Sequence, residues 1–281
     1  MRNKRLALAA VAALVACGGE GGPESSTASA PAIPEIRFTA HDFTFEGPDT
    51  IQAGLVTFAL TNEGETLHHL QLVRLPEGMS MEEFQEGMAQ MQPGMPPPPW
   101  LHDAGGVNPP PPGRAARVTQ HIEAGEYAVL CFVDTPDRVP HVMKGMIRPL
   151  TVLPSRSPAA PLPASDLTLT LVDYAFGFSA PPTAATRVIR VENAATQSHE
   201  IAVFRFLPGK TMDDLVAWAT TYEGPEPFEP VGGVPAIHAG QAVNMEVELT
   251  PGDYVALCFV PDATDGKLHL EHGMAMPFSI S

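Results

Sequence analysis

The chain has 281 residues, with 16 Lys or Arg against 32 Asp or Glu, and a formal net charge of −16. This acidic balance argues against binding to nucleic acid or to anionic lipid headgroups, because both are themselves negatively charged. The chain has three cysteines. A thiol left unpaired in an oxidising compartment tends to oxidise unless it is buried or bound to a metal, so unpaired cysteines need an explanation.

The first residues have the pattern of an export signal. A basic start precedes the apolar run Leu6–Val15, which is too short to span a bilayer as a stable helix. The run ends in Leu-Val-Ala-Cys17, which resembles a bacterial lipoprotein signal, so we expect residues 1–17 to be a signal peptide with Cys17 lipidated. An ordinary cleaved signal is the alternative, and both readings place the mature protein outside the cytoplasm. Residues 18–35 predict a flexible linker.

The remainder of the chain contains an internal repeat. Several motifs recur 127 residues further on, and one Asn-to-His spacing recurs after 131 residues. They are Gly105-Gly-Val with Gly232-Gly-Val, Gly125-Glu-Tyr with Gly252-Asp-Tyr, Cys131-Phe-Val with Cys258-Phe-Val, and Asn62 to His68 with Asn193 to His199. We therefore expect two domains, 36–153 and 167–281, joined by a Pro-, Ser- and Ala-rich linker at 154–166.

Each copy is dominated by short alternating runs. Examples are EIRFTAHDFTF and LTLTLVDYAFGF, and they are separated by Gly and Pro. This pattern predicts antiparallel strands that pack as an all-β sandwich. One helix interrupts the strands in each copy, beginning at Ser80 and at Thr211, each with an acidic residue three positions on.

Four side chains with metal-binding chemistry occur in the same order in each copy. They are His68, Cys131, His141 and Met146 in the first, and His199, Cys258, His269 and Met274 in the second. Two imidazoles, a thiolate and a weak thioether make up the blue-copper electron-transfer site. A strand-start histidine and one long loop after the cysteine could bring these ligands to one end of the sandwich.

The sequence resembles the cupredoxin family at these residues. The hallmark Gly-x-Tyr-x-x-x-Cys, a loop, then His-x-x-x-Gly-Met runs from Gly125 to Met146 and again from Gly252 to Met274. The resemblance implies two tandem Greek-key β-sandwiches, each with a short helical insertion, and up to one copper ion, as Cu(I) or Cu(II), in each. The Cys-to-His loops have nine and ten intervening residues, more than in plastocyanin-like proteins and fewer than in copper nitrite reductases.

Some ligand choices stay open at this level. His69 adjoins His68, and His272 competes with His269, although the repeat alignment favours His68 and His269. Met143 competes with Met146 but lacks the preceding Gly. We interpret the methionine-rich stretch after Met79 as an apolar helix face rather than a Cu(I)-capturing one.

These features predict an exported, lipid-anchored electron carrier with an unidentified redox or copper-trafficking partner. The alternatives are copper storage or delivery, and a metal-free tandem sandwich that binds other proteins. No His-x-His pair occurs in the chain, so a multicopper oxidase cluster is not expected, and we predict that the protein is not an enzyme.

Overall fold

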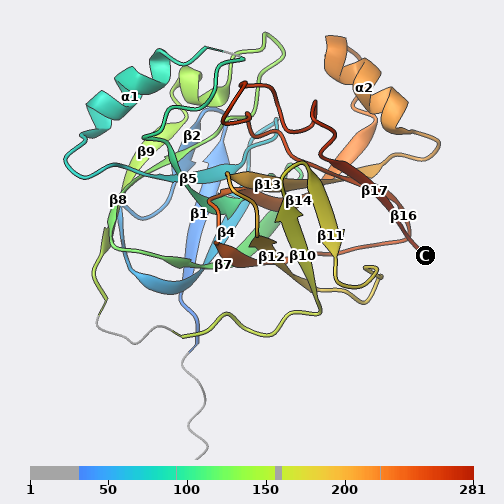
Figure 1. Cartoon of the computed structure of the whole chain (residues 1–281), viewed down its shortest axis with the longest axis horizontal. Coiled ribbons are helices and arrows are strands. Elements are labelled where there is room, and N and C mark those ends of the chain that lie inside the picture. Colours follow the sequence, from blue (N-terminus) through green and yellow to red (C-terminus); the bar gives the residue numbers. More distant parts are fainter. Residues whose placement is uncertain (1–31, 93, 156–159, 222) are drawn as a thin grey trace, which may run out of the picture. The chain divides into compact units, whose positions relative to one another are not determined.

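The computed structural model describes residues 32–92, 94–155, 160–221 and 223–281. The expected signal peptide, its lipidated Cys17 and most of the 18–35 linker lie outside the described residues. Among those described, no helix is both long and apolar enough to cross a membrane. Ile33–Ser281 packs as one unit, and the two sequence copies lie within it (Figure 1).

The first copy contains nine strands and one α-helix among its described residues. They are β1 (Glu35–His41), β2 (Thr44–Glu46), β3 (Thr50–Gln52), β4 (Gly54–Asn62), β5 (Leu70–Arg74), α1 (Met81–Ala89), β6 (His102–Val107), β7 (Ala115–Ile122), β8 (Gly125–Leu130) and β9 (Ile147–Leu153). A 3₁₀ turn, His141–Lys144, precedes β9.

The second copy repeats this order with eight described strands and one α-helix. They are β10 (Leu167–Val172), β11 (Ala175–Phe178), β12 (Val188–Asn193), β13 (His199–Phe206), α2 (Met212–Thr221), β14 (Phe228–Ile237), β15 (Ala242–Glu246), β16 (Gly252–Leu257) and β17 (Ala275–Ile280). The expected all-β class, with two sandwiches that each carry one helix, is confirmed.

The two copies share both of their sheets. One sheet has the order β11-β10-β12-β15-β7-β4-β1-β2, and the other has β17-β16-β13-β14-β6-β5-β8-β9-β3. The copies meet where β15 pairs with β7 and where β14 pairs with β6, both antiparallel. One buried apolar cluster extends across this junction and includes Val118, Ile237 and Val243. Strand edges that would be exposed in an isolated copy are therefore paired.

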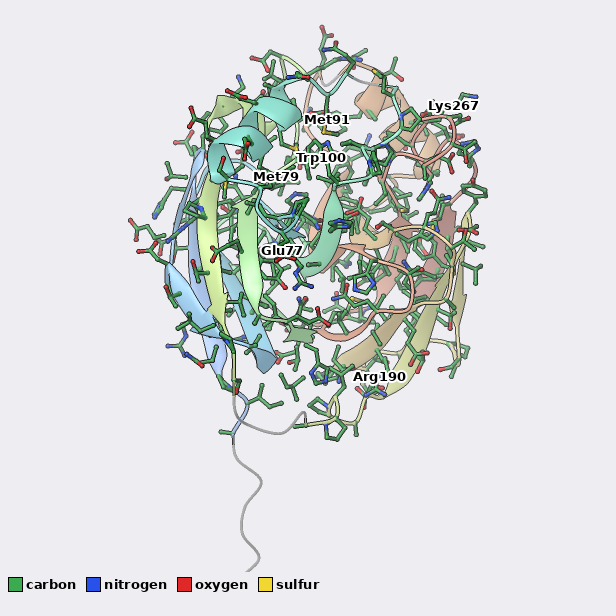
Figure 2. The ribbon with its side chains drawn as sticks, turned by 60° about the vertical axis from the view of Figure 1, so that its left-hand side comes forward. Glu77, Met79, Met91, Trp100, Arg190 and Lys267 are labelled. Carbon is green, nitrogen blue, oxygen red and sulfur yellow. The ribbon has the colours of Figure 1, made fainter. Side chains whose placement is uncertain are left out.

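The helices lie at the same end of the molecule, one over each copy (Figure 1). Helix α1 begins with the expected capping box: Glu83 N–H donates to Ser80 Oγ at 3.1 Å, and Ser80 N–H donates to Glu83 Oε2 at 2.8 Å. Its buried face, Phe84 and Met88, packs on β5 and β8. Met79, Met91 and Trp100 pack against the same cluster (Figure 2). Methionines of the stretch that begins at Met79 thus pack in an apolar contact, as the sequence predicts.

The repeated Gly-Gly-Val motif has a steric role beside the ligand strands. Gly106 and Gly233 have φ values of 126° and 139°. A Cβ at Gly106 would lie 1.9 Å from Leu70 O, and one at Gly233 would lie 2.0 Å from Ile201 O. Only glycine therefore allows β6 and β14 to approach the beginning of β5 and β13.

Candidate metal centres

Two buried clusters of histidine and cysteine form at equivalent positions in the two copies. The first contains His68, Cys131 and His141, and the second contains His199, Cys258 and His269; in each, the potential donor atoms lie within 4.8 Å of one another. All six side chains are fully buried. We call these the first and second centres.

The chain brings each set together from three places. His68 lies in the loop before β5, and His199 is the first residue of β13. The cysteines directly follow β8 and β16. Asn62 shapes the loop before His68, because its side chain donates to Thr66 O at 2.9 Å and accepts from Gly64 N–H at 3.0 Å. Asn193 does the same before His199, which accounts for the repeated Asn-to-His spacing.

The donor separations fit a single metal ion. His68 Nδ1 lies 3.1 Å from His141 Nδ1, which is 3.5 Å from Cys131 Sγ. Cys258 Sγ lies 3.3 Å from His269 Nδ1 and 3.8 Å from His199 Nδ1. Metal–nitrogen bonds of about 2.0 Å and metal–sulfur bonds of about 2.3 Å at trigonal angles would separate nitrogen pairs by about 3.5 Å and nitrogen from sulfur by about 3.7 Å. The residues present therefore suit a copper ion, for which two imidazoles and a thiolate are a preferred set.

An aspartate orients the first histidine of each centre, and sequence reasoning missed it. Asp42 Oδ1 lies 2.8 Å from His68 Nε2, and Asp173 Oδ1 lies 3.0 Å from His199 Nε2. A proton on Nε2 donates to the carboxylate and leaves Nδ1 with a free lone pair facing the other donors. The two aspartates are 131 residues apart, the same offset as the histidines. A search of the internal repeat for carboxylates could therefore have found them.

The pKa shifts of Asp42 and His68 favour an ionised carboxylate and a neutral imidazole, which is the form of histidine that binds a metal. Partial burial tends to raise the pKa of Asp42, but hydrogen bonds from His68 and from the Glu65 and Thr66 backbone outweigh it and lower the pKa. Burial lowers the pKa of His68, opposed by Asp42. A neutral imidazole beside an ionised carboxylate is the state in which the ring can ligate a metal.

The second histidine of each centre is held neutral by its surroundings. Burial, followed by the neighbouring His68, lowers the pKa of His141 to about 4. Burial and His199 lower the pKa of His269 to about 4 in the same way. Each ring also packs edge-on against an aromatic side chain, Phe43 at 4.9 Å and Tyr174 at 5.5 Å between centroids.

The cysteines are free thiols in the described part of the chain. Burial raises the pKa of Cys131 to about 12, and it also raises the pKa of Cys258. Without a cation beside it, each sulfur stays protonated at neutral pH. A metal that binds there must therefore displace a proton, so its affinity should depend on pH.

Met146 and Met274 are fully buried in the same apolar cluster as the cysteines. Met146 N–H donates to His141 O at 3.0 Å, and its carbonyl accepts from Cys131 N–H at 3.2 Å. Met274 makes the same two contacts, with His269 and Cys258. The preceding Gly145 has φ 100°, a conformation that suits glycine and turns the chain so that histidine and methionine approach the cysteine.

The competing histidines lie elsewhere. His69 Nε2 accepts a hydrogen bond from Phe132 N–H at 2.8 Å, and His69 does not belong to the first donor cluster. His272 is partly exposed and lies 3.2 Å from Asp265 Oδ1. The structure thus places His68 and His269 with the cysteines, as the repeat alignment favours.

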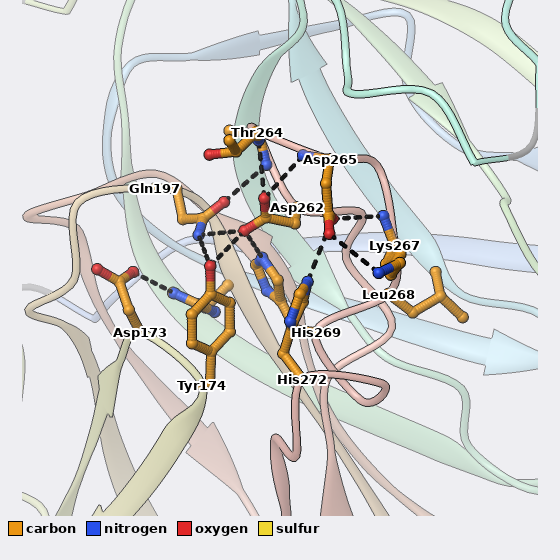
Figure 3. A network of polar contacts seen from close by, with 12 residues as sticks. Asp173, Tyr174, Gln197, Asp262, Thr264, Asp265, Lys267, Leu268, His269 and His272 are labelled. Carbon is orange, nitrogen blue, oxygen red and sulfur yellow. Dashed lines mark hydrogen bonds and ion pairs between the residues drawn. The ribbon is translucent and has the colours of Figure 1, made fainter.

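The two centres differ in what covers them. Asp262 lies 3.8 Å from His269 Nε2 in the second centre. Its carboxylate accepts from Tyr174 Oη at 2.6 Å and from Gln197 Nε2 at 2.9 Å (Figure 3). Although burial tends to raise the pKa of Asp262, these hydrogen bonds hold it well below its usual range. Near the first centre, Lys144 lies 5.7 Å from the Phe43 ring and pairs with Asp137 at 2.7 Å, so the two centres have different charged neighbours.

Comparison with known proteins gives structural likenesses only. No protein-family model matches the chain, and no curated protein matches it. Among solved structures, an auracyanin from Roseiflexus castenholzii is 18% identical and covers 44% of this chain and 100% of its own, with a TM-score of 0.30. A blue copper oxidase from Nitrosomonas europaea is 16% identical over 89% of this chain and 86% of its own, with a TM-score of 0.26.

A copper nitrite reductase from Nitrosomonas europaea is also similar, at 12% identity over 89% of this chain and 94% of its own, with a TM-score of 0.24. The oxidase and the reductase are enzymes, and this finding contradicts our expectation that the protein is not an enzyme. The absence of a His-x-His pair in the sequence had prompted that expectation. A His-x-His pair belongs to one kind of copper cluster only, so its absence bears on that cluster alone.

Proposed function

We propose that the protein binds one copper ion in each copy and transfers single electrons. The observation that carries this proposal is the burial, twice in one chain, of two imidazole Nδ1 atoms and one thiol at separations that suit a single metal ion. Copper would supply the redox chemistry by alternating between Cu(I) and Cu(II).

The protein's own residues would hold the ligands still during this cycle. The paired strands fix the cysteine and the first histidine, while Asp42 and Asp173 fix the tautomer and ring orientation. Ligands placed on rigid elements and supported by further hydrogen bonds move little when the charge of the site changes. Small movement favours fast exchange of an electron.

A copper titration tests the proposal. Purified protein with Cu(II) should develop an intense thiolate-to-copper absorption band with two ions bound. Cys131→Ser and Cys258→Ser should each remove part of the band, and the double variant should remove all of it. His269→Gln should also diminish the band, whereas the matched control His272→Gln should preserve it. No retained copper and no band in the intact protein would refute the proposal.

Redox cycling distinguishes electron transfer from copper storage or delivery. An electron carrier should pass through repeated reduction and oxidation with its copper still bound. Loss of Cu(I) to a chelator at each reduction would instead identify a delivery protein. The redox partner is proposed to be a soluble or membrane-associated protein outside the cytoplasm.

Export and anchoring are a separate part of the proposal. They rest on the basic start, the Leu6–Val15 run and Cys17 in the sequence. Radiolabelled palmitate should be incorporated into the full chain expressed in a bacterium, and Cys17→Ala should abolish the labelling. Equal labelling of both proteins would contradict lipidation at Cys17.

A further inference from the structure

The loops that join cysteine to histidine in the two centres turn in the same way. We call residues 132–140 the first ligand loop and residues 259–268 the second ligand loop. An isolated β-bridge closes each loop. The residue at the tip takes a left-handed conformation in both, with φ 62° at Arg138 and φ 74° at Gly266. Each tip N–H donates back to a carbonyl of its own loop, over 2.7 Å and 3.0 Å respectively. The two tips are therefore equivalent positions.

The conformation of Arg138 is unusual for its residue type. Glycine adopts a left-handed conformation readily, whereas a residue with a Cβ is strained in it. Such strain persists only where the surroundings fix the residue, and strained residues gather at functional positions. The equivalent Gly266 needs no such explanation. An arginine at the tip of the first ligand loop is instead explained by what its side chain contacts.

The Arg138 side chain contacts the helix of the other copy. Its Nη2 donates to Thr220 O, one of the carbonyl groups at the end of α2 that have no partner inside the helix. Within Met212–Thr221, the last turn contains no basic residue. A cation at this end of a helix interacts favourably with the unpaired carbonyl groups. Arg138 of the first copy thus supplies the cation at the C-terminal end of α2 in the second copy.

Gly266 makes the reciprocal contact. A Cβ on Gly266 would lie 2.5 Å from Gly94 O and 2.4 Å from the carbonyl carbon of Met95. Gly94 and Met95 lie between α1 and β6 in the first copy. The second ligand loop therefore lies directly against the backbone of the first copy, and only glycine permits this approach. In both centres, the tip of the ligand loop contacts the helical insertion of the opposite copy.

The tip of the first ligand loop is linked to a metal ligand through hydrogen bonds. Asp137 accepts from Val139 N–H at 3.1 Å and from Lys144 Nζ at 2.7 Å. His141 N–H donates to Val133 O at 2.9 Å. Fixing each residue of a long loop has an entropic cost, so a contact that holds the tip reduces the freedom of the whole loop. A loose tip should therefore loosen His141.

We propose that each helical insertion positions the copper-ligand loop of the opposite copy, with Arg138 as the positioning residue of the first centre. The proposal rests on the copper binding proposed above. It makes the two copies interdependent, because residues of one copy help to set the geometry of the centre in the other. Copper in either centre is then retained less firmly when the contact from the opposite copy is lost.

Hydrogen exchange of the metal-free protein tests the first contact without any need for copper. Arg138→Ala should speed amide exchange in a peptide that spans residues 133–141 by about fivefold, which corresponds to about 1 kcal/mol for a charge at a helix end. Arg138→Lys keeps a cation and should exchange within about twofold of the parent. Unchanged exchange in Arg138→Ala would overturn the positioning role of this residue.

A change in α2 distinguishes positioning across the copies from a local role of Arg138. Leu215 is buried and packs α2 onto the second copy, so Leu215→Ala loosens this helix. The Cys258→Ser background leaves only the first centre. There, Arg138→Ala and Leu215→Ala should each speed copper release to a chelator by about fivefold and shift the thiolate-to-copper band. The two effects should not add in the double variant, because both remove the same contact.

Leu169→Ala is the matched control for Leu215→Ala. Leu169 is a fully buried leucine of β10 in the second copy, and its replacement should leave copper release from the first centre unchanged. Additive effects of Arg138→Ala and Leu215→Ala, or equal acceleration in Leu169→Ala, would overturn positioning across the copies. Leu215→Val serves if the alanine variant does not fold.

Two glycine variants test the second contact in the Cys131→Ser background. Gly266→Ala places a Cβ against the first copy, whereas Gly209→Ala has a similar φ of 76° with nothing within 4 Å of its Cβ. Gly266→Ala should release copper about tenfold faster, and Gly209→Ala should match the parent. Equal release from both would overturn the contact at the second centre. Absence of any thiolate-to-copper band would refute the proposed function instead, and hydrogen exchange of the metal-free protein would still decide whether the insertion holds the loop.

Discussion

Replacement of Asp42 by asparagine tests how much the orienting carboxylate contributes to copper binding. The Nε2 of His68 lies 2.8 Å from Asp42 Oδ1, and the asparagine amide oxygen can still accept this hydrogen bond. Asp42→Asn therefore keeps the His68 tautomer and removes the negative charge. Charged partners contribute about 1.5–3 kcal/mol to such a bond, roughly twice the neutral value.

The expected loss of copper affinity follows from the weaker neutral hydrogen bond and from the partial exposure of Asp42. Changes to orienting partners of metal-ligating histidines cost about 10–100-fold in metal affinity. The side chain of Asp42 is 36% exposed, so solvent screens part of its charge, and we expect a loss of about tenfold, equivalent to about 1.4 kcal/mol.

The assay isolates the first centre by working in Cys258→Ser. Cu(II) affinity is measured by competition with a chelator, following the thiolate-to-copper band. Asp173→Asn in the same background is the matched control, because Asp173 contacts His199 at the second centre, 3.0 Å away, and should leave the first centre unchanged. An affinity of Asp42→Asn within about twofold of the parent would refute the reasoning.

Three further predictions concern stability. Burial raises the pKa of Asp103 from 3.8 to about 6. Ionisation of this buried carboxyl group therefore lowers the free energy of unfolding as the pH rises from 3.8 to about 6. Asp103→Asn should accordingly stabilise the protein by up to about 3 kcal/mol at pH 7.5. Urea unfolding at pH 7.5 and 3.5 checks this, since the gain should vanish at the lower pH, and destabilisation at pH 7.5 would contradict it. Copper at about 1,000 times its Kd should stabilise the folded state by about 4 kcal/mol per centre; a thermal midpoint that copper does not shift would count against binding to the folded state. Gly106→Ala would place a Cβ 1.9 Å from Leu70 O and should lower the midpoint by several degrees, whereas Gly78→Ala, with open space around the Cβ, tests the cost of a positive φ alone; equal losses would contradict the steric argument.

Local sequence pattern determined much of the fold because its signals act over short distances. Alternation predicts strands, since successive side chains of a strand face opposite sides. The Ser80 and Glu83 spacing predicted a helix start, because a capping box closes within one turn. The internal repeat identified two copies of one ligand order, and the structure places His68, Cys131 and His141 together.

The orienting aspartates were missed for a physical reason. Asp42 is separated from His68 by 26 residues, and strand pairing rather than local spacing brings them together. Each aspartate lies in a turn between paired strands, β1 to β2 or β10 to β11. Its position relative to the ligand histidine depends on how β1 and β10 pair in parallel with β4 and β12.

The sequence by itself determined the ligand order, the strands, the helix start and the duplication, because these depend on residue chemistry and short spacings. Only the tertiary structure decided that β6 pairs with β14 and β7 with β15, so that two copies share their sheets. That pairing depends on complementary edges far apart in the chain, and no local pattern specifies it. The same pairing buries Asn108 of the first copy against Glu200 and Ile201 of the second, and it thereby joins the two repeated copies into one molecule.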